Sequence, residues 1–139
     1  MGLKVVTAGT FDLPHSGHVN FLRRCAELGE VTVILNTDEF IERYKGKPPV
    51  LSYNERLTIL SEFASVSAIV PNWGEENCSA VVEEEFPDIL AIGSDWARKD
   101  YYKQMGFTQD WLDQRGISLL YIPYTTGIST TEIKRRLQG

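Results

Sequence analysis

The sequence predicts one α/β domain spanning residues 1–139, in which helices cover both faces of a parallel sheet. Apolar runs of strand length alternate with segments of helical pattern, which is typical of βαβ units. The chain has 139 residues, of which 42% are hydrophobic, so it can build one core of its own. Neither a repeat nor a linker divides it. Polar, glycine-containing segments follow several strands, at the edge where open α/β sheets bind ligands.

The strands are placed where short apolar runs are bounded by polar or turn residues. The first run contains Val5 and Val6 and leads directly into a glycine-containing turn. Five such runs are predicted to be strands: Lys4–Ala8, Val31–Asn36, Ala68–Pro71, Ile89–Ile92 and Ser118–Ile122.

The helices are placed between the strands, where apolar residues recur at spacings of three and four. Two helix starts carry a capping box, Ser52 with Glu55 and Ser129 with Glu132. The lysine- and proline-containing segment Tyr44–Leu51 lacks a helical pattern and is predicted to be a mobile loop. Helices are predicted at Gly17–Leu28, Tyr53–Phe63, Ala80–Phe86, Gln109–Gln114 and Thr130–Leu137.

Charge and composition exclude several classes of function. The formal net charge is −5, and no cluster of lysines and arginines offers the basic surface that nucleic acids need. No apolar run reaches the length of a membrane span, and none has the form of a signal peptide. The two cysteines, Cys25 and Cys78, stand at unrelated positions, which indicates free thiols in a reducing compartment. We therefore expect a cytoplasmic protein that binds neither nucleic acid nor membrane.

The segment Gly9–His18, with the sequence Gly-Thr-Phe-Asp-Leu-Pro-His-Ser-Gly-His, is the most informative part of the chain. It joins the first strand to an amphipathic helix, and such a turn directs backbone N–H groups toward one point, which suits a phosphate. Both histidines of the protein lie in it, and one helical turn can bring His15 and His18 to the same ligand. A βα turn with an aspartate cap and two solvent-facing histidines is the simpler alternative.

This segment resembles the signature of the H-x-G-H nucleotidyltransferase superfamily, whose members transfer a nucleoside monophosphate from a nucleoside triphosphate. A second segment, Gly127-Ile128-Ser129-Thr130-Thr131, resembles the R-T-x-G-I-S-T-T motif of its cytidylyltransferases. With Gly93-Ser94-Asp95-Trp96 between them, the chain is most similar to the glycerol-phosphate enzymes of that family, from Lys4 to about Leu137. The resemblance implies a Rossmann-like nucleotidyltransferase domain with strand order 3-2-1-4-5, a homodimer, CTP as co-substrate, and Mg²⁺.

The activity that the resemblance implies is transfer of CMP from CTP to the phosphate or phosphonate of a small polar acceptor, with release of pyrophosphate. Such an acceptor is an oxyanion at neutral pH, so the reaction requires no strong general base. The sequence also shows no Ser–His or Cys–His pattern for nucleophilic catalysis. The enzyme has to hold two anions in line and stabilise the charge that grows at the α-phosphate.

Within the first turn, the resemblance assigns His15 and His18 as hydrogen-bond donors to the α- and β-phosphate oxygens. The Thr10 hydroxyl and the Phe11 backbone add further donors. Two glycines allow the main chain to approach the nucleotide closely, and these are Gly9 and Gly17.

Three charged residues are candidates for binding the acceptor, namely Asp12, Lys45 and Arg56. Lys45 and Lys47 can close over the triphosphate and the acceptor, and a solvated loop with two lysines is the alternative. Arg56 matches an arginine beside the family's site, so Lys45 and Arg56 are counted with the histidines as catalytic. Asp12 either orients a histidine or a lysine, helps hold Mg²⁺ through water, or only fixes the turn. No residue is predicted to be a direct metal ligand.

The other nucleotide-binding candidates follow the fourth and fifth predicted strands. Gly93, Asp95 and Trp96 are predicted to shape the base and ribose pocket, although a core position explains Trp96 nearly as well. Hydroxyls and free N–H groups at the start of the last helix can bind the β- and γ-phosphates, with ordinary helix capping as the alternative. That second group consists of Ser129, Thr130 and Thr131, preceded by Tyr124, Gly127 and Ile128.

The chain departs from the family pattern in three places. Tyr124 stands where the cytidylyltransferase motif has an arginine, and Lys99–Trp111 is longer than the family's connection. Asn72-Trp73 is followed by Gly74-Glu75-Glu76, where the glycerol-phosphate enzymes carry lysines. Two glutamates repel a phosphorylated polyol, which favours a shorter acceptor such as 2-hydroxyethylphosphonate. An adenylyltransferase of the same superfamily and a nucleotide-binding module without catalysis are the alternatives.

Overall fold

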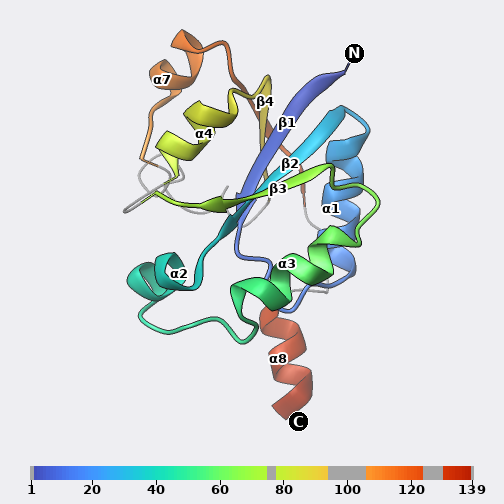
Figure 1. Cartoon of the computed structure of the whole chain (residues 1–139). Coiled ribbons are helices and arrows are strands. Elements are labelled where there is room, and N and C mark those ends of the chain that lie inside the picture. The colour runs from blue at the N-terminus through green and yellow to red at the C-terminus, as the bar shows by residue number, and fades with distance from the viewer. Residues whose placement is uncertain (1, 75–77, 94–105, 124–129, 139) are drawn as a thin grey trace.

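The computed structural model describes residues 2–74, 78–93, 106–123 and 130–138, which form a parallel sheet with helices on both sides (Figure 1). The strand order is β3-β2-β1-β4-β5, and every neighbouring pair is parallel. The predicted fold class and strand order are thereby confirmed. The strands are β1 (Leu3–Gly9), β2 (Gly29–Asn36), β3 (Ala68–Asn72), β4 (Ile89–Ile92) and β5 (Ser118–Tyr121).

The predicted helices are all found, with ends that differ from the expected ones by at most two residues. The capping box at the start of α3 is confirmed, because Ser52 and Glu55 exchange side-chain and backbone hydrogen bonds. Among the described residues, no helix combines the length and the apolar character that crossing a membrane requires. The helices are α1 (Ser16–Ala26), α2 (Asp38–Lys45), α3 (Tyr53–Ser61), α4 (Ser79–Glu85), α7 (Gln109–Gln114) and α8 (Thr130–Gln138).

Helix α2 was not predicted, and its last two residues, Tyr44 and Lys45, fall in the segment expected to be a loop. Thr37 caps it, accepting a hydrogen bond from the Phe40 N–H at 3.2 Å, and Gly46 ends it with a left-handed φ of 79°. The helix is only 8 residues long and buries one side chain, Ile41. Because so short a helix shows little more than two turns of periodicity, the apolar pattern alone does not reveal it.

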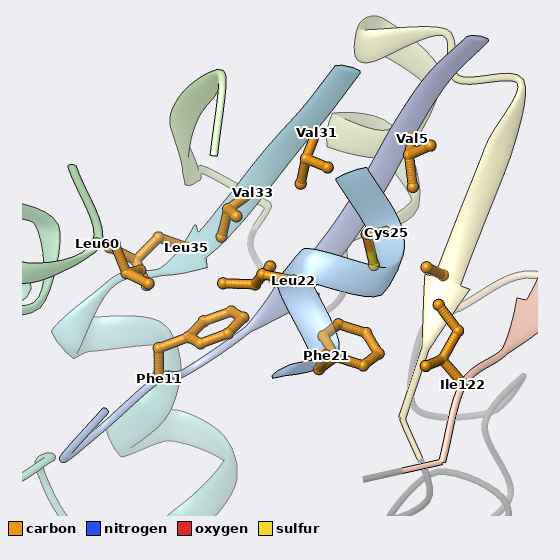
Figure 2. Close-up of a cluster of buried hydrophobic side chains, with 11 residues drawn as sticks. Val5, Phe11, Phe21, Leu22, Cys25, Val31, Val33, Leu35, Leu60 and Ile122 are labelled. Carbon is orange, nitrogen blue, oxygen red and sulfur yellow. The ribbon is translucent and has the colours of Figure 1, made fainter. Parts of the chain in front are cut away.

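Two apolar layers, one on each face of the sheet, form the core. Consecutive strand residues point to opposite faces, so Val5 packs with α1 and α3 while Val6 packs with α4 and α7. Figure 1 shows these helix pairs on opposite sides of the sheet. The layer under α1, shown in Figure 2, consists of Val5, Phe11, Phe21, Leu22, Cys25, Val31, Val33, Leu35, Leu60, Ala91 and Ile122.

The two cysteines lie in different layers of this core. Cys25 packs on the α1 side and Cys78 on the α4 side, and both are buried thiols that form no disulfide. Burial raises the pKa of each thiol to about 12, so neither forms a thiolate at neutral pH. Both side chains therefore serve packing in the core.

Candidate functional site

The turn between β1 and α1 lies at the carboxyl edge of the sheet, and its backbone is strained. Phe11 and Leu13 adopt left-handed φ angles of 50° and 53°, which L side chains rarely take. The Phe11 ring is buried in the core and holds its residue in place. A Cβ atom on Gly9 would lie only 2.8 Å from that ring, so the turn requires glycine there.

The two histidines stack at the start of α1. Their ring centroids are 3.9 Å apart, with 29° between the ring planes. His15 caps the helix, since its Nδ1 accepts a hydrogen bond from the N–H of buried Gly17 at 3.0 Å. The Nδ1 of His18 accepts from the N–H of His15 at 3.2 Å. Because both Nδ1 atoms are acceptors, each neutral ring carries its proton on Nε2.

The surroundings keep both rings neutral. Burial lowers the pKa of His15. Burial, with repulsion from His15 as the smaller cause, lowers the pKa of His18 to about 3. At neutral pH the site therefore presents two Nε2–H donors without a formal positive charge, as the predicted role of the histidines requires.

This low pKa predicts that the stability of the protein depends on pH through His18. An unfolded histidine binds a proton below pH 6.5, whereas folded His18 does so only near 3, so the free energy of unfolding decreases as the pH falls through this window. Relative to a His18→Gln variant, the wild type should lose about 1.4 kcal/mol for each pH unit once the unfolded histidine is protonated.

Urea unfolding of both proteins at half-unit steps of pH measures this difference. Titrating carboxylates affect wild type and variant alike, so the difference between the two curves isolates the histidine. A difference that does not change between pH 7 and pH 4.5 would show that folded His18 is protonated as readily as an unfolded one.

Asp12 joins the turn to the segment that precedes α3. Its Oδ2 accepts from the Val50 N–H at 2.8 Å, and its Oδ1 accepts from the Leu51 N–H at 2.9 Å. Among the alternatives, the observed contacts are those of a residue that fixes local structure. Its predicted contact with an acceptor and its link to Mg²⁺ stay predictions.

Arg56 requires a correction, because its side chain is fully buried within the protein. Its Nη1 donates to the backbone oxygens of Thr10 and Asn36, both at 2.8 Å. Its Nη2 donates to Asp38 Oδ1 at 2.7 Å, and its Nε donates to the Leu51 oxygen at 3.1 Å. An enclosed guanidinium has no surface for an acceptor, so Arg56 is a positioning residue that ties β1, β2, α2 and α3 together at the site.

Lys45 and Lys47 are exposed beside the turn. They belong to the segment 45–49, here called the lysine segment, which links the end of α2 to the residues held by Asp12. The Lys45 ammonium lies 5.7 Å from the centre of the Tyr44 ring. This location suits the predicted closing over the phosphates, and the contact itself stays a prediction.

A chain of hydrogen-bonded side chains at this edge was missed in the sequence. Asn72 Nδ2 donates to Asn36 Oδ1 at 2.9 Å, and Asn36 Nδ2 donates to Thr10 Oγ1 at 3.1 Å. The Tyr44 hydroxyl lies 3.2 Å from the same Thr10 oxygen. The available signal was an asparagine at the end of each of two apolar runs, β2 and β3, where buried amides need partners.

Only some of the other predicted site residues lie in the part of the chain that the structure describes. Gly93 is buried directly after β4, and Thr130 and Thr131 begin α8. Arg43 at the end of α2 donates to the Gly74 oxygen at 3.3 Å, which brings the chain after β3 near the site. Several predicted positions lie outside the described residues: Glu75, Glu76, Asp95, Trp96, Lys99, Tyr124, Gly127, Ile128 and Ser129.

The site so built is a strained turn at the carboxyl edge of the sheet with two neutral histidine donors, and comparison with known proteins assigns the chain to a family. The family described as cytidylyltransferase-like matches residues 6–136, which include both histidines and nearly all of α8. The chain belongs to this family. The protein is thus an enzyme of the cytidylyltransferase class.

Individual relatives of this cytidylyltransferase agree with the assignment. The chain is 36% identical to glycerol-3-phosphate cytidylyltransferase of Bacillus subtilis, over 98% of each chain. It is 32% identical to bifunctional protein HldE of Actinobacillus pleuropneumoniae, over 97% of this chain and 28% of that protein. A solved lipopolysaccharide core biosynthesis protein from Thermoplasma volcanium superposes with a TM-score of 0.69 at 28% identity, covering 90% of this chain and 98% of that one.

Proposed function

We propose that this cytidylyltransferase moves CMP from CTP onto the phosphate or phosphonate oxygen of a small polar acceptor. The observation that carries this proposal is the stacked pair of neutral histidines, whose Nε2–H groups are preorganised at the carboxyl edge of the sheet. Donors fixed before the reaction stabilise charge that develops at phosphate oxygens without reorganising in the transition state. Membership of the cytidylyltransferase-like family supports CTP as the nucleotide.

The chemistry needs no proton transfer by the protein. An acceptor oxygen forms a new bond to the α-phosphorus of CTP, and the bond from that phosphorus to the bridging oxygen breaks. Pyrophosphate leaves with the bonding electron pair, and the two Nε2–H donors hold the oxygens on which charge increases. The cationic lysine segment reduces the repulsion between the two anions.

We further propose that Mg²⁺ enters with the triphosphate. Among the residues that the structure describes, no group of three or more His, Cys, Asp and Glu side chains is arranged to hold a metal. Mg²⁺ commonly keeps several waters and binds through substrate phosphates with one or two carboxylates. Asp12, whose oxygens accept backbone hydrogen bonds at the turn, is the carboxylate that we propose to contact the ion through water.

Two acceptors are candidates, each favoured by a different observation. Glycerol 3-phosphate is the acceptor that the names of relatives 34–38% identical to this chain state for those proteins. A shorter hydroxyalkyl phosphonate is favoured by Glu75 and Glu76, which replace lysines and repel the far part of a phosphorylated polyol.

Pyrophosphate release, measured with each of the four nucleoside triphosphates and Mg²⁺, tests the proposal against both acceptors. We expect CTP to be the preferred nucleotide, and we expect 2-hydroxyethylphosphonate to match or exceed glycerol 3-phosphate in kcat/KM. Faster turnover with ATP than with CTP would contradict cytidylyl transfer. Two charge-assisted contacts change kcat/KM by about a hundredfold or more. A preference of that size for glycerol 3-phosphate would establish that compound as the acceptor.

A further inference from the structure

The lysine segment is attached to the β1–α1 turn on both of its sides. Before it, the Tyr44 hydroxyl lies 3.2 Å from Thr10 Oγ1. After it, the Asp12 carboxylate accepts from the backbone at positions 50 and 51, at 2.8 and 2.9 Å. The residues on both sides of the segment are thereby tied to the same turn that carries the histidines.

The hydrogen bonds around Thr10 determine where its proton can point. A threonine hydroxyl has one proton to donate and two lone pairs that accept. Asn36 Nδ2 fills one lone pair at 3.1 Å, and Asn36 is fixed in this orientation because its Oδ1 accepts from Asn72. Either hydroxyl can donate in the contact between Tyr44 and Thr10. With Tyr44 as the donor, the second lone pair is filled, and the Thr10 proton then points away from both partners, where an anion at the turn can accept it.

The Tyr44 ring also carries the first cation of the lysine segment. Phe40 packs edge-on against the ring at 5.5 Å, and the Lys45 ammonium lies 5.7 Å from the ring centre. The Tyr44 residue is 44% exposed, so its hydroxyl lies against Thr10 although solvent is available.

We propose that Tyr44 is a positioning residue for the triphosphate. Its hydroxyl directs the Thr10 proton to a phosphate oxygen and fastens the lysine segment to the same turn. This inference rests on the proposed function, and it makes Tyr44 a residue that acts through Thr10 without contacting a reacting atom.

A double-mutant cycle tests the inference, with Tyr44→Phe, Thr10→Val and the combined variant. The first change removes only the hydroxyl and keeps the ring, and the second keeps the shape of threonine. We expect Tyr44→Phe to raise the Kd of CTP by about three- to tenfold, as the loss of one hydrogen bond does, with kcat changed less than about twofold. In the Thr10→Val background the same change should have no further effect on CTP binding.

Titration calorimetry gives the Kd of CTP, and steady-state pyrophosphate release gives kcat. Thr58→Val is a matched control, because this exposed threonine donates within α3, to the Asn54 oxygen at 2.8 Å. An equal rise in Kd in both backgrounds, or no rise in either, would overturn the inference while the wild type stays active. A wild type that neither binds nor turns over CTP would contradict the proposed function and this inference with it.

Discussion

We expect His18→Asn to lower kcat for cytidylyl transfer by about 10²–10³, the loss typical of removing one preorganised oxyanion donor. The asparagine oxygen can still accept from the His15 N–H, now 3.2 Å from Nδ1, so the start of α1 keeps its hydrogen bond. What disappears is the Nε2–H donor, which we propose to hold a phosphate oxygen. Because this donor is needed most in the transition state, CTP binding should weaken far less than kcat.

His18→Gln is the matched variant, since its longer amide carries an N–H to about the position of Nε2. It should recover part of the lost kcat, whereas a purely structural histidine would be replaced better by asparagine. Single-turnover rates at saturating CTP, with circular dichroism to check folding, separate the two cases. If His18→Asn keeps kcat within a few-fold of the wild type, the histidine supports the turn and takes no part in transfer.

The second large effect is expected on stability, from replacing Arg56 with methionine. The guanidinium is fully buried and makes four hydrogen bonds, three of them to backbone oxygens. Methionine leaves these oxygens without their donor and Asp38 without its partner. We expect the free energy of unfolding to fall by about 3–5 kcal/mol, which is the usual cost of breaking a buried ionic network. The total free energy of unfolding of a small domain is only about 5–15 kcal/mol.

Urea unfolding measures this loss, with Arg24→Met as the control. Arg24 lies exposed on α1, so its replacement should change stability by no more than about 0.5 kcal/mol. Arg56→Lys should recover a minor share of the loss, because an ammonium cannot reproduce the planar fork of donors. If the Arg56→Met protein is as stable as the wild type and has lost only its affinity for the acceptor, the result would support the direct acceptor contact predicted from the sequence.

Local chemistry explains which elements were predictable. The alternating valines of β2 and the capping box of Ser52 depend on neighbours within a few residues, so the sequence contains the whole signal. The histidine turn is equally local, since His15 and His18 contact each other within one helical turn. Helix α2 was missed because 8 residues with one buried side chain leave too short a pattern.

By itself, the sequence determined the parallel α/β class and, through motif resemblance, the strand order and the family. Only the tertiary structure decided that Arg56 is buried against the protein's own backbone and that Tyr44 meets Thr10. Arg56 contacts the Thr10 oxygen 46 positions away in the chain, and Tyr44 reaches Thr10 across 34 positions. A charged or polar side chain looks the same in a sequence whether it faces substrate or the protein's own backbone. The packing of distant segments determines which partner it meets, and no local pattern records that packing.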